Sequence, residues 1–303
     1  MKIAILGATG HLSKCVFWSF YQDSEVEFFL FSRSKIRAEI FYGQFVDAKI
    51  KYFDDYQMFH AFDYDLIFNG IGSWDSKDQP SNSIFSITEY YDNLIMAYQK
   101  EHPQSISIHV SSGAAYANPF SSPANENTQT EIMINRIAEK DFYSIAKINS
   151  EAKHRAFPEL NIVDIRLFGF FSRYMSLEYS YLLSSLIQSV KNHQTFKMIK
   201  DDFWRDYIHM DDFSLLLHEI IKTKKLNIAI DVRSKLPISK NELVHFFIEK
   251  YGLKVEENIA AKISKTGIKP FYYSEQKNDF YIPRYTSLEA VKSELTFFME
   301  ETL

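Results

Sequence analysis

The sequence has one cysteine, Cys15, in 303 residues. A single cysteine excludes an internal disulfide and a metal centre built from several cysteine ligands. It also fits a reducing compartment, so we expect a cytoplasmic protein. The histidines lack the HxH, HxxxH and HExxH spacings of local zinc motifs, and we therefore expect no metal site.

Positive charge and long apolar runs are scarce as well. The formal net charge is −5, which offers no general basic surface for nucleic acid or an anionic membrane. No apolar run approaches the roughly 18 residues of a membrane span. The first run breaks at GATG, too early for a signal peptide. With 46% apolar residues, the chain can bury a large core in one domain or in two interlocked ones.

Strand-like runs and helical patterns alternate through the first half of the chain. The expected strands are 3–6, 26–31, 65–69, 105–110 and 162–167, and the clearest helices are 88–100 and 142–155. This alternation predicts an α/β fold with a parallel sheet covered on both faces. The segment 117–130, rich in Pro, Ser and Asn, is expected to form a loop over the carboxyl edge of the sheet.

The stretch GATGHLS follows the first strand and precedes a helical pattern with Val16, Phe17 and Phe20 on one face. A tight turn at Gly7 and Gly10 would let the backbone approach a phosphate, and it would aim the helix N-terminus at that anion. A plain strand-to-helix turn is the alternative.

A second informative stretch carries Tyr143 and Lys147, four residues apart and so on one face of a helix. An ammonium beside a phenol stabilises the phenolate and lowers its pKa from about 10, which makes the phenol useful in proton transfer. By itself this spacing is also common on solvated helices. Upstream, the strand 105–110 runs into Ser111 and Ser112, at the sheet edge where parallel α/β folds bind ligands.

Taken in this order, the turn, the strand-end serines and the Tyr/Lys pair resemble the extended short-chain dehydrogenase/reductase family of nucleotide-sugar epimerases, dehydratases and ketoreductases. Further similar segments are FNGIG at 68–72, YYDN at 90–93, RLFGFF at 166–171 and RDYIHMDD at 205–212. The resemblance covers residues 1 to about 240 and implies a Rossmann-type doubly wound parallel sheet with a smaller C-terminal substrate-binding subdomain.

The resemblance implies catalytic roles for Ser112, Tyr143 and Lys147. Ser112 stands four residues before Tyr116, as in the family's S-x-x-x-Y, and Ser111 is the alternative. Arg205 is similar to an arginine that grips the diphosphate of the substrate in several members, so Ser112 and Arg205 are the expected substrate-binding residues. The alternative for Arg205 is an ion pair with Asp206 or Asp211.

The expected cofactor site follows from the same resemblance. Its residues are Gly7, Thr9, Gly10, His11, Leu12, Ser32, Arg33, Asp54, Asn69, Gly70 and Lys147. NAD-dependent relatives place an acidic residue after the second strand, where it accepts from the ribose 2′-hydroxyl, whereas this chain has Ser32 and Arg33. We therefore expect NADP(H), with NAD(H) possible and a solvated basic edge as the other explanation.

Two positions depart from the family pattern. Ser13 stands where the third glycine of GxxGxxG is usual, which could weaken cofactor binding or hold the helix off the strand. Gly169 replaces an asparagine that touches substrate in many members, so the sugar is not identified.

The expected reaction is NADPH-dependent reduction of a keto group on a nucleotide-linked deoxysugar, in the synthesis of cell-surface glycan precursors. Ser112 is followed by Gly113 and Ala114, not by the Asp-Glu pair of 4,6-dehydratases. The alternatives are a nucleotide-sugar epimerase with tightly bound NAD and a noncatalytic NADP(H) sensor.

For the domains, we expect a dinucleotide-binding unit over 1–167, with 205–225 crossing back to it, and a mainly substrate-binding part over 168–303. A homodimer is expected through the helices that carry YYDN and YSIAK.

Overall fold

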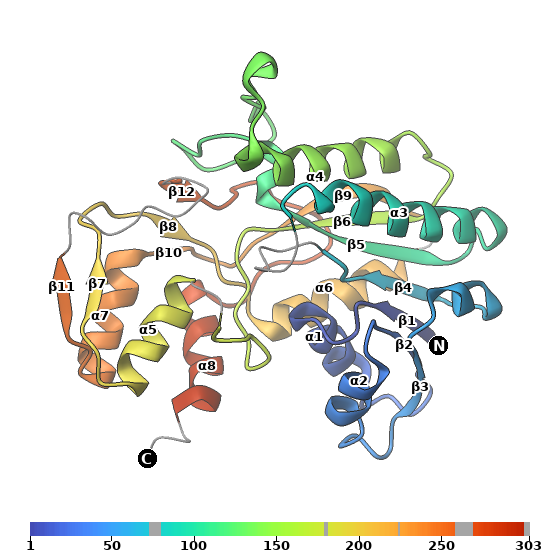
Figure 1. Cartoon of the computed structure of the whole chain (residues 1–303), viewed down its shortest axis with the longest axis horizontal. Helices are drawn as coiled ribbons and strands as arrows, with labels where there is room; N and C mark the ends of the chain where they lie inside the picture. Colours follow the sequence, from blue (N-terminus) through green and yellow to red (C-terminus); the bar gives the residue numbers. More distant parts are fainter. Residues whose placement is uncertain (73–79, 179–180, 224, 258–268, 300–303) are drawn as a thin grey trace.

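The computed structural model describes residues 1–72, 80–178, 181–223, 225–257 and 269–299. Its centre is a seven-stranded sheet in the order β3-β2-β1-β4-β5-β6-β9, and all the strand pairs are parallel (Figure 1). The strands are β1 (Lys2–Leu6), β2 (Glu27–Phe31), β3 (Lys49–Phe53), β4 (Leu66–Asn69), β5 (Ile106–Ser112), β6 (Ile162–Leu167) and β9 (Asn227–Val232). The strand order reverses between β1 and β4, which is where doubly wound sheets open a ligand crevice.

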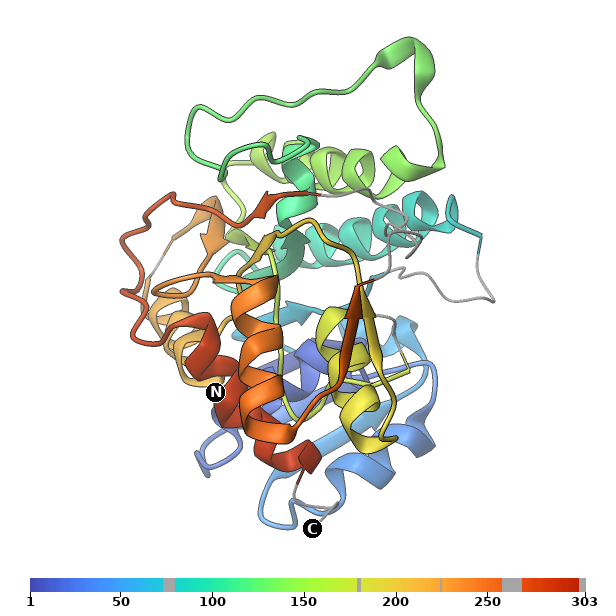
Figure 2. The ribbon, with the colours of Figure 1, turned by 90° about the vertical axis from the view of Figure 1, so that its left-hand side faces the viewer.

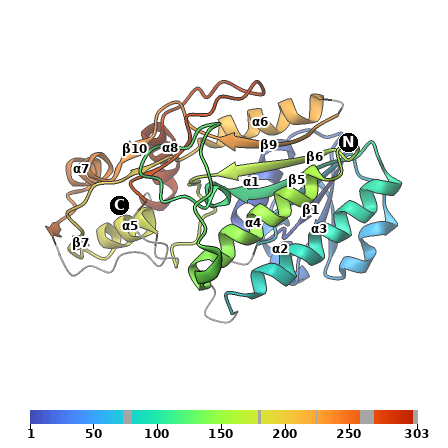
Figure 3. The same cartoon turned by 90° about the horizontal axis from the view of Figure 1, so that it is seen from above.

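Helices cover both faces of this sheet (Figures 1 and 3). One face carries α1 (His11–Phe20), α2 (Lys35–Tyr42) and α6 (Met210–Lys222), and the other carries α3 (Ser83–Glu101) and α4 (Glu139–Arg155). Short 3-10 helices are η1 (Tyr56–Ala61), η2 (Gly113–Tyr116) and η3 (Ile134–Arg136). The apolar run Ile3–Leu6 of β1 is fully buried, because β1 is an inner strand of a parallel sheet whose two faces are both covered by helices.

A smaller lobe stands beside the carboxyl edge of the sheet, at the left of Figure 1 and facing the viewer in Figure 2. It contains α5 (Leu182–Lys191), α7 (Lys240–Tyr251), α8 (Ser287–Met299) and two small sheets with the orders β10-β8-β12 and β11-β7. These strands are β7 (Phe196–Met198), β8 (Trp204–Arg205), β10 (Ile238–Ser239), β11 (Val255–Glu257) and β12 (Phe271–Tyr272). Leu186, Phe247 and Val291 are at the centre of its own apolar core.

The chain returns from the small lobe to the large sheet after β8. Helix α6 packs against α1, and β9 pairs with β6. Of the stretch 205–225, residue 224 lies outside the described residues. The expected doubly wound parallel α/β fold is confirmed. In the described part of the chain, no helix is both long enough and apolar enough to cross a membrane.

Element boundaries differ from the expected ones where polar residues extend an element. Strand β5 continues to Ser112 because Ser111 and Ser112 still pair with Arg166 and Leu167 of β6. Helix α4 begins at Glu139. The Asp141 side chain accepts from the N–H of Ala138 at 3.0 Å, so the backbone donor just before the helix has a hydrogen-bond partner.

Candidate active site

The turn between β1 and α1 has the geometry of a phosphate-binding loop. Gly7 has φ +73°, and a Cβ there would lie 2.9 Å from Ile71 Cγ1, so only glycine fits. Gly10 precedes α1 and donates to Gly7 O at 2.9 Å. Thr9 is exposed at the tip, and Leu12 lies half-buried in the first turn of the helix. The N–H groups at the start of α1 can therefore face a bound diphosphate.

The Ser13 side chain fills the space beside Gly70, the residue that follows β4. The Ser13 side chain is fully buried, and a Cβ on Gly70 would overlap its Oγ and lie 3.0 Å from the Phe68 ring. Helix α1 can therefore pack closely on the sheet although it carries Ser13, because the facing residue, Gly70, has no side chain. Among the described residues, Ser13 Oγ has no hydrogen-bond partner.

The ends of β2 and β3 hold the residues expected at the adenosine. Phe31 and Phe53 pair at the carboxyl ends of these strands, so Arg33 and Asp54 follow neighbouring strand ends, and both are exposed. Ser32 is buried and donates to Ser34 O at 2.8 Å. The exposed Arg33 guanidinium is therefore accessible to an anion at this edge, and the Ser32 hydroxyl is already engaged.

Two tyrosines that the sequence analysis did not single out line the same crevice. The Tyr56 hydroxyl donates to Phe31 O at 3.4 Å, the carbonyl that also accepts from Gly7 N, and the Tyr56 ring packs against Tyr91 with ring centres 5.0 Å apart. Burial raises the pKa of both phenols, while the Arg33 charge lowers it slightly.

Two of the expected cofactor residues turn their side chains elsewhere. His11 Nε2 lies 2.7 Å from Ser172 Oγ, and burial together with the Lys14 charge lowers the His11 pKa to about 4. Asn69 accepts from Ile71 N at 3.2 Å, and its amide nitrogen faces His109. The side chains of His11 and Asn69 are therefore engaged with other protein groups.

The two neighbouring serines at the end of β5 point in opposite directions. Ser111 is buried and donates to Glu151 Oε1 at 2.5 Å. Ser112 Oγ lies 3.0 Å from the hydroxyl of Tyr272 and hydrogen-bonds Tyr143. Of the two serines, Ser112 is therefore the one beside the Tyr143 hydroxyl. Tyr272 comes from β12, far along the sequence, and was not anticipated.

Lys147 is next to Tyr143 but is not directed at its hydroxyl. Its Nζ donates to Val110 O at 2.7 Å and lies 5.7 Å from the centre of the Tyr143 ring. Burial raises the pKa of Tyr143, and the Ser112 hydrogen bond opposes that rise only in part. The expectation that Lys147 lowers this pKa is therefore not met in this geometry. Burial also lowers the pKa of Lys147, opposed by nearby carboxylates.

Arg205, on β8, lies near Tyr272, with its guanidinium carbon 5.7 Å from the centre of the Tyr272 ring. It donates to Trp204 O at 2.7 Å and Lys269 O at 2.9 Å, and its guanidinium lies 4.2 Å from the Phe203 ring centre. Asp206 instead accepts from Ser234 and Ser287, so the suggested Arg205–Asp206 ion pair is not formed.

A second cation, Lys269, lies close to Arg205 and was missed in the sequence. Its Nζ is 4.8 Å from the centre of the Tyr272 ring. Burial and the Arg205 charge lower the pKa of Lys269 to about 8. Two cations therefore lie beside Tyr272, whose hydroxyl is 3.0 Å from Ser112 Oγ, and their charges would attract an anionic group.

The glycine at position 169 is required by close contact with a neighbouring backbone segment. A Cβ at this position would lie 2.5 Å from Asp206 O, so the chain has no room here for the asparagine of many relatives. The backbone after β6 runs too close to the RDYIHMDD segment to carry a side chain toward a substrate.

Comparisons with known proteins identify the family and the fold. The family model of the NAD dependent epimerase/dehydratase family matches residues 3–229. A comparison with curated proteins gives no significant match.

Three solved structures illustrate the shared fold. The chain is similar to Helicobacter pylori ADP-L-glycero-D-manno-heptose-6-epimerase (14% identity, 98% of this chain and 96% of that chain, TM-score 0.76). It is similar to Bacillus anthracis dTDP-glucose 4,6-dehydratase in complex with NAD (15% identity, 99% and 97%, TM-score 0.77). It is also similar to Bacillus cereus UDP-glucuronic acid 4-epimerase in complex with UDP-glucuronic acid and NAD (14% identity, 99% and 100%, TM-score 0.77). The chain therefore belongs to the NAD-dependent epimerase/dehydratase family, enzymes of the extended short-chain dehydrogenase/reductase type.

Proposed function

We propose that this enzyme reduces a keto group on a nucleotide-linked deoxysugar with NADPH, in the supply of precursors for cell-surface glycans. The observation that carries the choice of NADPH is the end of β2, where the exposed Arg33 follows the buried Ser32. NAD-dependent enzymes of this type place a carboxylate there, and a carboxylate would repel the 2′-phosphate that an arginine attracts.

The residues around Ser112 fit the proton chemistry of a carbonyl reduction. When bound, NADPH supplies the hydride that adds to the carbonyl carbon. The Tyr143 hydroxyl donates a proton to the carbonyl oxygen, which becomes the alcohol, and Ser112 donates a hydrogen bond to the same oxygen. Lys147 is proposed to hold the ribose and to favour the phenolate left on Tyr143 once its ammonium turns from Val110 O.

The cations around Tyr272 fit the substrate class. A diphosphate bears charges that the guanidinium fork of Arg205 can bind in bidentate fashion, and Lys269 adds a second charge while it is protonated. We therefore propose that Arg205 and Lys269 bind the diphosphate, with the sugar carbonyl directed to Ser112.

A nucleotide-sugar epimerase with tightly bound NAD is the second candidate. It is supported by the solved relatives, which include two epimerases of sugar nucleotides. An epimerase would copurify with its cofactor and form product without added NADPH. A noncatalytic NADP(H) sensor is the remaining alternative, and it would bind the cofactor and turn over no sugar nucleotide.

The test combines ligand identification with a charge reversal. Mass spectrometry of the ligand released from the purified enzyme is expected to find NADP(H) or no stoichiometric dinucleotide, whereas NAD would favour the epimerase. We expect Arg33→Asp to weaken NADPH binding by about 1–3 kcal/mol and to change NADH binding far less. Equal losses for both cofactors would reject the NADPH assignment.

We also propose a homodimer formed through α3 and α4. Phe85 and Tyr90 of α3 are 37% and 55% exposed, which is high for large rings on a helix. Tyr90→Asp is expected to shift the protein from dimer to monomer in light scattering, and a wild-type monomer would end this proposal. Cytoplasmic localisation stays a prediction.

A further inference from the structure

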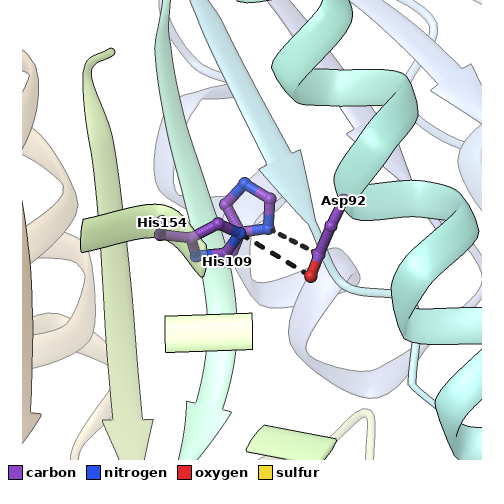
Figure 4. A group of neighbouring side chains, drawn as sticks. All are labelled: Asp92, His109 and His154. Atoms are coloured by element: carbon purple, nitrogen blue, oxygen red, sulfur yellow. Dashed lines mark ion pairs between the residues drawn. The ribbon is translucent and has the colours of Figure 1, made fainter. Parts of the chain in front are cut away.

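Two histidines and an aspartate that are distant in sequence meet between the sheet and its α3/α4 layer (Figure 4). Asp92 comes from α3, His109 from β5 and His154 from α4, and each is at most 3% exposed. Asp92 Oδ1 lies 3.4 Å from His109 Nδ1, and Asp92 Oδ2 lies 3.7 Å from His154 Nε2. One potential ligand atom from each residue lies within 4.8 Å of the others.

Hydrogen bonds determine which nitrogen of His109 carries the proton. The amide nitrogen of Gln99 donates to two backbone carbonyls at 2.8 and 3.1 Å, so its oxygen accepts from the Ser107 hydroxyl at 3.0 Å. Ser107 Oγ can then only accept from His109 Nε2, 3.1 Å away. The Nδ1 lone pair of a neutral His109 therefore faces Asp92. The amide nitrogen of Asn69, at 3.3 Å, is a donor to that same lone pair.

The proton of His154 is determined in a similar way. His154 Nδ1 lies 2.9 and 3.0 Å from the two carboxylate oxygens of Asp164, which only accept when ionised. The other nitrogen, Nε2, therefore presents a lone pair toward Asp92. It is buried and has no hydrogen-bond partner among the residues that the structure describes. A histidine whose far N–H is held by a carboxylate is typical of metal-binding imidazoles.

We propose that Asp92, His109 and His154 form a binding site for a divalent transition metal, with zinc as the best match. Ligand atoms at the usual 2.0–2.1 Å from a tetrahedral zinc lie about 3.3–3.4 Å from each other. Here Asp92 Oδ1 faces His109 at 3.4 Å, and Asp92 Oδ2, which also accepts from the Ser150 hydroxyl, faces His154 at 3.7 Å, so zinc binding requires a small rotation of the Asp92 carboxylate that brings one oxygen to both imidazoles. Two imidazole nitrogens with one carboxylate suit zinc better than magnesium or calcium, which prefer oxygen ligands.

A small cavity beside the cluster leaves room for a fourth ligand. Its volume is about 10 Å³, close to what one water needs, and its walls include Asp92, His109 and Ser150. The Asp92 carboxylate has one lysine within ion-pair distance in the described structure, Lys153 at 3.6 Å, which also pairs with Glu89 at 3.0 Å. A bound dication would neutralise this buried carboxylate and tie α3 and β5 to α4, the helix that also carries Tyr143.

The test is metal binding by the full-length protein, independent of its activity. The protein is stripped with a chelator, dialysed and titrated with Zn²⁺, and with Co²⁺ as a spectroscopic probe. We expect one equivalent of each metal, tetrahedral Co²⁺ absorption bands and a higher unfolding midpoint with Zn²⁺. His154→Ala is expected to abolish stoichiometric binding. Asp164→Asn, which loosens the ring that it orients, is expected to weaken binding about 10–100-fold.

The matched control is His245→Ala, because His245 is an exposed histidine paired with Glu249 at 3.0 Å. It should bind like the wild type. No stoichiometric binding by the wild type, unchanged binding in a folded His154→Ala protein, or an equal loss in His245→Ala would each overturn the proposal. If His154→Ala fails to fold, X-ray absorption on the zinc-loaded wild type decides: two imidazoles and oxygen ligands support the site, and any other ligand set refutes it.

Discussion

The packing of Ser13 against Gly70 allows a double-mutant cycle at the floor of the cofactor site. The perturbations are Ser13→Ala, Gly70→Ala and the pair together. Ser13→Ala removes a fully buried hydroxyl that has no hydrogen-bond partner among the described residues, and it introduces a better helix former. We expect the free energy of unfolding to rise by about 1 kcal/mol.

Gly70→Ala acts in the opposite direction. The new Cβ would overlap Ser13 Oγ and lie 3.0 Å from the Phe68 ring and 3.3 Å from Leu6 O. Overpacking of this kind destabilises by about 1–3 kcal/mol. In the double variant the overlap with the hydroxyl is gone, while the contacts to Phe68 and Leu6 remain. We therefore expect a favourable coupling energy of about 1–2 kcal/mol between the two positions.

Urea denaturation followed by circular dichroism, with all four proteins at one pH, gives the unfolding free energies. NADPH titration of the same proteins shows whether cofactor affinity changes with the packing of Ser13 and Gly70. Purely additive effects of the two substitutions would refute the claim that the Ser13 hydroxyl occupies the space left by Gly70.

Two further predictions concern the residues around Ser112. Ser112→Ala is expected to lower the rate of hydride transfer about 10²-fold. Ser111→Ala, which removes the 2.5 Å bond to Glu151, should instead lower thermal stability and leave hydride transfer nearly unchanged; the reverse pattern in single-turnover kinetics would exchange their roles. Because burial and Arg205 lower the pKa of Lys269 to about 8, its charge is present below that pH and lost above it. KM for the sugar nucleotide should therefore rise between pH 7 and pH 9 in the wild type but not in Lys269→Met, and equal pH profiles would contradict the role of Lys269.

Parts of the site that depend on local sequence could be predicted from it. The turn at Gly7 and Gly10 follows from a short strand-turn-helix pattern, and the structure has the positive φ at Gly7 that such a turn needs. The opposite directions of Ser111 and Ser112 follow from the alternation of side chains along a strand. The pattern alone does not say which of the two faces the crevice, because that depends on where α4 packs.

Residues brought in by long-range folding could not be predicted. Tyr272 and Lys269 reach Ser112 and Arg205 only because β12 pairs with β8, and these two-residue strands have no distinct periodicity. A search for local metal-binding spacings could not bring His109 and His154 together, because one lies on a strand and the other on a helix 45 positions later. The direction of Lys147 depends on its bond to Val110 O, which helical spacing does not reveal.

The most direct test of the central claim is hydride transfer by Tyr143→Phe. The variant keeps the ring and loses the hydroxyl that hydrogen-bonds Ser112. NADPH fluorescence titration should give nearly wild-type binding, and Lys147→Ala, measured beside it, should lose cofactor affinity and rate together. In single-turnover reduction of a panel of nucleotide-linked 4-keto-6-deoxysugars, we expect Tyr143→Phe to be about 10²- to 10⁴-fold slower than the wild type. A Tyr143→Phe enzyme that reduces any of these substrates at the wild-type rate would contradict the catalytic assignment.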